Sequence, residues 1–354
     1  MKAQHVLFLL LMLTGTSCQR VPQTASQHDT QPANNSYNSI YYWKTTFALN
    51  ATEKSFLEEY HIRRLYLRLF DVIPAEKNDP LNQSFGFEAI PNATIAFLET
   101  IPQNIEVVPV VYITIDALRL MQNSDNDYAG LLTERVMNMA DFHDLGPIHE
   151  VQLDCDWTRQ TQDCYFALCQ QLKDKLKPYS IELSCTIRLW QLRSACPPVD
   201  RGVLMLYNTG DLTKESTSNA ILDLDDIQVF LKGKDYNLPM SLAYPVFSWN
   251  VWFRNGQYLG LFHGLDLNDT SLYQAAESPW YIIQRDHKAE QRELLKGDRL
   301  RHEQISFSEL QQLDSLVRQK HPSFNDAPVI LYHLDSANLS HYSPDEIRQI
   351  YNRH

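Results

Sequence analysis

The chain has 354 residues, 44% of them hydrophobic, and 43 acidic against 31 basic residues give a formal net charge of −12. That length suits one large α/β domain, since barrels of about 250 residues or more fold as single units. The acidity argues against nucleic acid as a partner, because phosphate binding requires clustered Lys and Arg. It is explained by solubility alone and is compatible with a neutral partner such as a carbohydrate.

Residues 1–17 have the pattern of a bacterial signal peptide. Lys2 gives a positive start, and the apolar run at 6–13 is too short to span a bilayer as a stable helix. The following Gly15-Thr16-Ser17-Cys18 resembles a lipobox, without its usual leucine three residues before the cysteine. We therefore expect lipidation of Cys18 and a location in the bacterial cell envelope, with this lipid as the only membrane anchor. An ordinary signal peptide followed by a chance cysteine is the alternative.

Residues 18–38 are rich in Gln, Ser and Asn and have little to bury, which predicts a flexible tether. From residue 39 to 354 strand and helix patterns alternate. The predicted strands cover 40–47, 63–72, 105–115, 150–157, 181–190, 202–208, 239–249 and 328–335. The predicted helices cover 51–62, 92–101, 131–145, 163–180, 220–231, 307–319 and 346–354.

Eight strands alternating with helices predict a (β/α)8 TIM-type barrel. A doubly wound open sheet is the alternative, but the chain has no glycine-rich phosphate loop that would support a nucleotide-binding version. After the seventh strand, residues 250–262 predict an inserted β-hairpin that turns at Asn255-Gly256, the strongest short hairpin signal. We expect a polar stretch to follow it.

Two acids lie within the fourth predicted strand. Alternation places Val151, Leu153 and Cys155 on one side and Gln152, Asp154 and Asp156 on the other. The same rule sets Arg188 on the polar side of the fifth strand and Arg68 on that of the second. If the apolar sides face the helices, these charges converge inside the barrel near the strand C-termini, where barrel active sites lie. A buried ionic lattice that serves stability alone is the alternative.

Two short motifs carry a family resemblance. Asp154-Cys155-Asp156-Trp157 resembles the end of the DxxDxDxE motif of family 18 glycoside hydrolases, the chitinase-like barrels, and Met205-Leu206-Tyr207-Asn208 resembles their MxYD motif. The resemblance implies that Asp154 and Asp156 tune the catalytic acid and polarise the substrate amide, and that Tyr207 contacts the reacting sugar.

The motifs are degenerate. Val151 and Thr158 stand where the first Asp and the catalytic Glu belong, and Asn208 replaces the Asp of MxYD. The resemblance thus extends to the glycosidase-like barrel superfamily, and the substrate-assisted mechanism does not transfer.

Glycoside hydrolysis requires a carboxylic acid and a carboxylate on either side of the scissile bond. We predict Asp154 and Asp156 as that catalytic pair. Further candidates for substrate binding lie at or beyond strand ends: Arg68, Asp71, Arg188, Trp190, Tyr207, Asn208, Tyr244, Trp249, His333 and Asp335. Trp43 is expected in the core.

The aromatic candidates are included because aromatic rings suit the apolar faces of sugars. For His333 and Asp335 a structural role is an equally good interpretation: His333 as a hydrogen-bonded core histidine and Asp335 as the cap of a turn.

The histidines and cysteines show no metal-ligand spacing, so no metal and no cofactor are expected. Besides Cys18 there are five cysteines, and one disulfide among Cys164, Cys185 and Cys196 is possible. Two functions remain open: a lipid-anchored glycoside hydrolase-like protein acting on an envelope or environmental glycan, or an inactive barrel lipoprotein that binds glycan or scaffolds an envelope complex.

Overall fold

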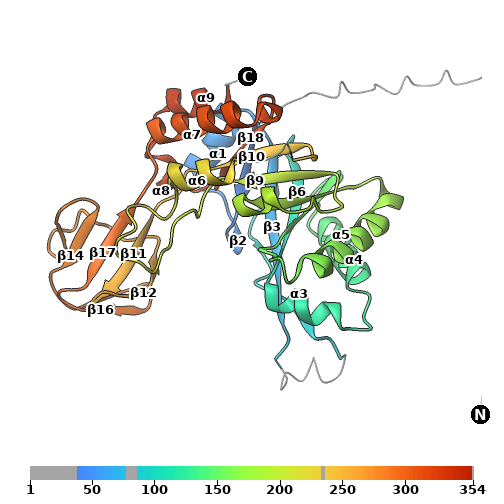
Figure 1. The fold of residues 1–354 in the computed structure, drawn as a ribbon, viewed down its shortest axis with the longest axis horizontal. Coiled ribbons are helices and arrows are strands. Elements are labelled where there is room, and N and C mark those ends of the chain that lie inside the picture. Colours follow the sequence, from blue (N-terminus) through green and yellow to red (C-terminus); the bar gives the residue numbers. More distant parts are fainter. Residues whose placement is uncertain (1–37, 77–85, 233–235, 353–354) are drawn as a thin grey trace, which may run out of the picture. The chain divides into compact units, whose positions relative to one another are not determined.

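The computed structural model describes residues 38–76, 86–232 and 236–352 (Figure 1). The expected signal peptide, the lipidated Cys18 and the tether lie outside the described residues, apart from Asn38, with which the first strand begins. Within the described part of the chain, no helix has both the length and the apolar character needed to cross a bilayer.

Eight parallel strands close into a barrel, which confirms the predicted fold. Strand β1 pairs with both β3 and β18, so the ring has no open edge. In spatial order the strands are β1 (Asn38–Tyr42), β3 (Ile62–Pro74), β6 (Glu106–Ile113), β7 (Glu150–Asp154), β8 (Glu182–Arg188), β9 (Arg201–Met205), β10 (Met240–Pro245) and β18 (Val329–Tyr332).

Helices follow most of the barrel strands. They are α1 (Ala51–Glu59), α3 (Ile115–Gln122), α4 (Tyr128–Phe142), α5 (Gln162–Leu176), α6 (Leu224–Phe230), α7 (Phe307–Lys320), α8 (Ser336–Leu339) and α9 (Pro344–Tyr351), with short 3-10 turns η1 (Lys177–Tyr179), η2 (Leu189–Arg193) and η3 (Pro322–Phe324). Capping boxes open three of them, at Asn50 with Glu53, Ser306 with Glu309 and Ser343 with Glu346. Each satisfies orphan N–H groups of a first helical turn.

The helix predicted at 92–101 is wrong. Described residues 86–105 form two short strands instead, β4 (Ala89–Asn92), antiparallel to β3, and β5 (Ala96–Phe97), parallel to β2 (Thr46–Phe47). Ala93 has a positive φ of 45°, which interrupts any helix there. The backbone N–H of Ala96 donates to Thr45 and that of Leu98 to Phe47, so pairing with the segment after β1 overrides the local pattern.

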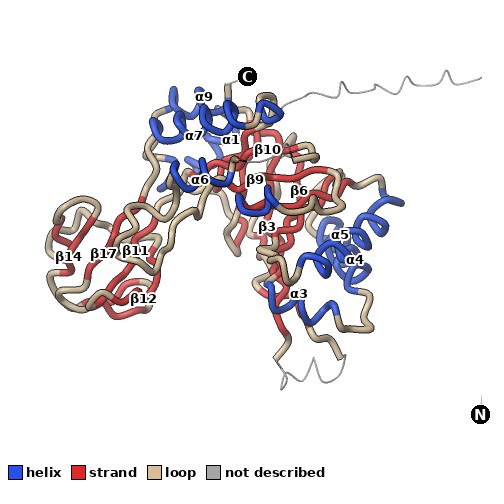
Figure 2. The backbone as a smooth tube through the Cα atoms, viewed as in Figure 1, coloured by secondary structure: helices blue, strands red, loops and turns tan. Residues whose placement is uncertain are grey.

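The predicted hairpin after the seventh strand is confirmed but is part of a larger insertion (Figure 2). Strands β11 (Trp249–Arg254) and β12 (Gln257–Phe262) turn at Asn255 and Gly256, whose φ values of 50° and 77° suit a type I′ turn. The stretch expected to be merely polar adds β13 (Tyr273–Ala275), β14 (Trp280–Ile283) and β17 (Arg299–Glu303) to this antiparallel sheet. A separate hairpin pairs β15 (His287–Ala289) with β16 (Arg292–Leu294).

A fully buried ion pair fastens this sheet to the loop after β9. Arg301 Nε donates to Glu303 Oε1 over 2.5 Å, and Arg301 Nη1 donates to the carbonyl of Lys214 over 2.6 Å. The other oxygen of Glu303 accepts from Trp249 Nε1 at 2.6 Å and from the backbone N–H of Ala220 at 2.9 Å. Both charges are therefore compensated by hydrogen bonds, as burial requires.

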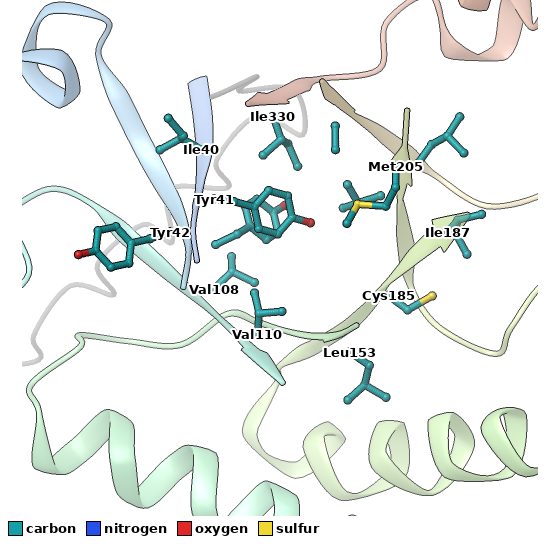
Figure 3. Close-up of a cluster of buried hydrophobic side chains, with 14 of the residues drawn as sticks. Ile40, Tyr41, Tyr42, Val108, Val110, Leu153, Cys185, Ile187, Met205 and Ile330 are labelled. Atoms are coloured by element: carbon teal, nitrogen blue, oxygen red, sulfur yellow. The ribbon is translucent and has the colours of Figure 1, made fainter. Parts of the chain in front are cut away.

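The barrel strands have two distinct sides (Figure 3). Tyr41 lies within the ring of strands, whereas its neighbour Tyr42 lies outside it. Inside, Tyr41 OH donates to Gln152 Oε1 over 2.7 Å, and Gln152 Nε2 donates to Ser184 Oγ over 3.3 Å. The outward residues of β7 and β8, such as Leu153 and Cys185, are fully buried apolar side chains. All five cysteines of the described residues are free, so the possible disulfide is absent from this structure.

Candidate functional site

The C-terminal mouth of the barrel gathers charged side chains from neighbouring strands. On β3, the register shifts between Arg68 and Phe70, which marks a bulge. In a regular strand, residues three apart face opposite sides, but the bulge lets Arg68 and Asp71 meet. Arg68 Nε donates to Asp71 Oδ1 over 2.7 Å, and a second bond joins Nη2 to Oδ2.

Asp154 is the last residue of β7 and is only 3% exposed. Thr186 Oγ1, on β8, donates to its Oδ1 over 2.6 Å. Burial raises the pKa of Asp154, and the carboxylates of Asp156 and Asp71 raise it further, while Arg188 and the Thr186 bond oppose the rise. Asp154 therefore holds its proton more strongly than an ordinary carboxyl group does.

Asp156 differs from Asp154 in exposure and in partner. Its side chain is 43% exposed, and Arg188 Nε, at the end of β8, donates to its Oδ1. The second guanidinium nitrogen of Arg188, Nη1, is buried and has no hydrogen-bond partner among the described residues. Two carboxyl groups two residues apart thus have separate surroundings: a buried hydroxyl bond for Asp154 and a half-exposed ion pair for Asp156.

Aromatic rings from four segments lie beside these charges. Tyr207, just after β9, stacks on Tyr332 of β18 with ring centroids 4.9 Å apart and an interplanar angle of 29°. Trp43, just after β1, contacts Tyr332 at 5.7 Å, and the Arg68 guanidinium lies 5.6 Å from the Trp43 ring. Phe247, after β10, completes the group at 5.7 Å from both tyrosines. Trp43 and Tyr332 remain partly exposed, whereas Tyr207 is 3% exposed.

The charges act on the same rings. Burial raises the pKa of Tyr332, Asp154 raises it further, and Arg188 and Arg68 oppose the rise. Partly exposed Tyr112, on β6, has its pKa raised to about 12 by burial and by Asp156 and Asp154. The acids and arginines therefore act electrostatically on these tyrosines.

Several predicted candidates lie elsewhere. Tyr244 is buried, and its hydroxyl donates to Asp314 on α7, so it faces the helices rather than the interior. The reason is parity, because Tyr244 is paired in register with Leu331, whose neighbour Tyr332 points inward. Trp249 is 7% exposed, and its ring N–H donates to Glu303, so its role is structural.

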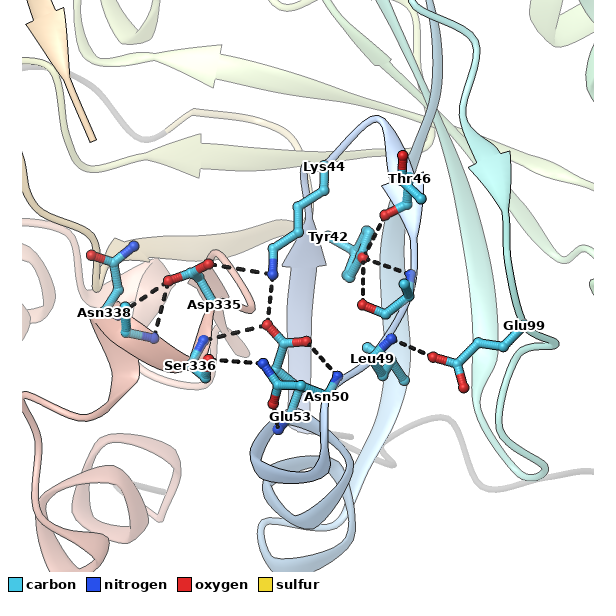
Figure 4. A network of polar contacts seen from close by, with 12 residues as sticks. Tyr42, Lys44, Thr46, Leu49, Asn50, Glu53, Glu99, Asp335, Ser336 and Asn338 are labelled. Atoms are coloured by element: carbon cyan, nitrogen blue, oxygen red, sulfur yellow. Dashed lines mark hydrogen bonds and ion pairs between the residues drawn. The ribbon is translucent and has the colours of Figure 1, made fainter. Parts of the chain in front are cut away.

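Asp335 belongs to a capping network with Lys44 and Glu53 (Figure 4). Its Oδ1 accepts from the backbone N–H groups of Ala337 and Asn338, and its Oδ2 lies 3.3 Å from Lys44 Nζ. Lys44 also pairs with Glu53 at 2.6 Å. The alternative interpretation of Asp335 as a turn cap is therefore the one the geometry supports.

The remaining candidates lie around the rim. Trp190, on η2, is half-buried and packs edge-on against Trp157 at 5.3 Å. Asn208 is exposed, has a φ of 57°, and donates its N–H to Ile221. His333, next to Tyr332, has a buried Nδ1 without a partner among the described residues, and burial lowers its pKa to about 4. It is therefore a neutral imidazole near pH 7.

A second charged layer lies at the opposite, N-terminal end of the barrel. Arg64 Nη2 is 3.1 Å from Glu106 Oε2, and Arg64 Nη1 is 3.3 Å from Glu150 Oε2. Arg201 joins Glu182 at 2.7 Å, and burial raises the pKa of Glu150. Because the N-terminal face of such barrels serves stability, we interpret this layer as structural.

Sequence reasoning missed the partly exposed aromatics of the mouth. Trp43 lies two residues beyond the inward-facing Tyr41, and Tyr332 two residues beyond Ile330. Strand parity, which correctly places Asp154, would have placed both rings on the inner side. No group of three or more His, Cys, Asp or Glu side chains among the described residues is arranged to hold a metal ion.

The fold is shared with glycoside hydrolase-like barrels of known structure. The spore cortex-lytic enzyme SleL of Bacillus cereus is similar with a TM-score of 0.50 and 10% identity, over 90% of this chain and 75% of that one. A chitinase of Chromobacterium violaceum gives 0.51 and 12%, over 90% and 98%, and the class V chitinase of Nicotiana tobaccum gives 0.50 and 10%, over 90% and 99%. Searches of protein-family models and of curated protein sequences find no match.

The chain therefore has a chitinase-like (β/α)8 fold, at an identity that establishes architecture and not activity. By the motif resemblance, Thr158 stands at the position of the family's glutamate. Its backbone N–H donates to Thr161 Oγ1 over 2.9 Å, within the turn that leads to α5. A hydroxyl at that position cannot serve as the carboxylic acid that protonates a leaving group.

Proposed function

We propose that the protein binds a glycan at the mouth of its barrel. The observation that carries the proposal is the pairing of two partly exposed rings, Trp43 and Tyr332, with the ion pair of Asp156 and Arg188 at the same rim. Flat rings with polar neighbours suit sugars, whose ring faces are apolar and whose edges carry hydroxyls. Hydroxyls hydrogen-bond well to charged groups that already lie in place.

Candidate glycans come from an envelope or from the environment. Neighbours of the same fold include a spore cortex-lytic enzyme and chitinases, so chitin oligosaccharides and bacterial cell-wall fragments are the first probes to use. The proposed lipid on Cys18 would hold the barrel at a membrane surface, where such polymers are available. Replacing Cys18 with Ser should release the protein into the soluble fraction; retention in the membrane would contradict the anchor.

Hydrolysis is the second candidate function. It is favoured by the contrast between Asp154, whose pKa is raised, and the half-exposed Asp156 beside it, because acid–base pairs arise where two carboxyls have different environments. It is weakened by Thr158 and by the deep burial of Asp154, which leaves it little access to a leaving group.

Two assays distinguish glycan binding from glycan hydrolysis. Calorimetric titration of wild-type protein with the oligosaccharide panel should give binding, and Trp43→Ala should weaken it roughly tenfold or more, as loss of a central aromatic contact does. The control is Tyr179→Ala, an exposed tyrosine preceding the N-terminal end of β8. Release of reducing sugar that disappears in Asp156→Asn would establish hydrolysis, whereas no binding to any glycan would overturn the proposal.

A further inference from the structure

A cavity of about 540 Å³ lies on the outer side of the barrel wall, away from the mouth. Its floor is formed by Phe70 and Val72, which the bulge in β3 turns outward, and by Ala89 of β4. Leu132 and Met139 of α4 form the facing wall. The lining is mostly apolar, and the volume lies within the range of small-molecule sites.

The cavity has a structural origin in the link between β3 and β6. In a regular barrel a helix covers the outer face between two such strands. In the described residues 86–105 of this link there are only the short strands β4 and β5, so Phe70 and Val72 have no helix of that segment packed on them. Phe70 and Val72 are themselves buried at the base of the cavity, and the apolar surface open to a ligand is that of Leu131, Met139 and Phe142 on α4.

Arg135 of α4 is the unusual member of the lining. Its guanidinium lies 4.8 Å from the Phe70 ring, and its Nη2 donates to Thr94 Oγ1 over 2.9 Å. Among the described residues, its buried Nε has no hydrogen-bond partner and no carboxylate forms an ion pair with it. Burial alone lowers the pKa of Arg135. A partly buried cation without an anion costs free energy that an incoming anion would recover.

We propose that this cavity binds a single-chain amphiphile, with its hydrocarbon chain along Leu131, Met139 and Phe142 and its carboxylate head on Arg135. A carboxylate matches the planar fork of a guanidinium, including the vacant Nε. Glu134, on the rim, adds a negative charge that disfavours a doubly charged phosphate head. The ligand is a free fatty acid, taken up either from solution or from a lipid surface that carries it.

The test uses the full chain and three probes: dissolved dodecanoate, dodecanol, and phosphatidylglycerol vesicles that carry dodecanoate. Dodecanoate should bind, and Arg135→Gln should weaken it by roughly tenfold or more, as loss of a charged hydrogen-bonded partner does. The same variant should change dodecanol binding less than about twofold, because no charge is involved. Arg119→Gln, an exposed arginine of α3 paired with Asp116, is the matched control.

A second variant guards against misfolding. Asn138 is an exposed residue of α4 that also lines the cavity, so Asn138→Trp should fill the space without disturbing the core and should abolish binding of both probes. Uptake of dodecanoate from the vesicles but not from solution identifies the lipid surface as the source of the fatty acid. Dodecanoate affinity that is unchanged in both Arg135→Gln and Asn138→Trp would overturn the proposal.

Discussion

Arg301→Met offers a stringent test of how the inserted sheet is held. The substitution keeps an unbranched side chain in the space of the guanidinium but removes the donors that reach Glu303, Lys214 and Leu212. Glu303 would then be a fully buried carboxylate without its cation. Removing one partner of a buried pair costs about 3–5 kcal/mol, and the donors from Trp249 and Ala220 that remain place this case near 3 kcal/mol.

Urea denaturation followed by fluorescence measures this loss as a lower midpoint at unchanged slope. A domain of ordinary stability has a free energy of unfolding of about 5–15 kcal/mol, so this loss would be a substantial part of it. The double variant Arg301→Met with Glu303→Gln removes the unpaired charge and should recover at least about 1 kcal/mol of the single variant's loss. A single variant that loses less than about 1 kcal/mol, or a double variant that is no more stable, would refute the reasoning.

Three further outcomes follow from individual contacts. Tyr41→Phe leaves Gln152 without its donor and should lower the free energy of unfolding by about 1–3 kcal/mol in the same urea assay; an unchanged midpoint would show that water replaces the bond. Gly210→Ala would set a Cβ 2.9 Å from the Ala220 Cα and should destabilise by about 1–3 kcal/mol, whereas Gly264→Ala, where only a side-chain atom lies 3.9 Å away, should not. His333, with its pKa of about 4 against an ordinary 6.5, takes a proton more readily when unfolded, so stability should fall by up to roughly 3 kcal/mol between pH 6.5 and 4; a His333→Phe variant with the same pH profile would contradict this.

Patterns local to the chain predicted much of the barrel. The eight strands and the turn at Asn255-Gly256 depend on residues that are neighbours in sequence, so periodicity and turn chemistry suffice to find them. The helix prediction at 92–101 failed because β5 pairs with β2, which lies about fifty residues earlier in the chain. The strands of the insertion after β12 were missed because they are only three to five residues long, too short for alternation to be recognised.

The mouth shows the same division. Parity alone places Asp154, Arg188 and Tyr207 on the inner side of their strands. The ion pairs of these acids could not be predicted from the sequence. No local pattern indicates that Asp156 pairs with Arg188, or that a bulge brings Asp71 to Arg68. Tyr244 was misplaced because strand ends were weighed more than parity.

The central claim is that the ring-lined mouth is where a glycan binds, and a crystal structure with a soaked chitin oligosaccharide or cell-wall fragment tests it most directly. The account predicts a sugar ring lying against Trp43 and Tyr332, with its hydroxyls on Asp156 or Arg188. A sugar bound only on the outer wall or on the inserted sheet, with an empty mouth, would contradict it.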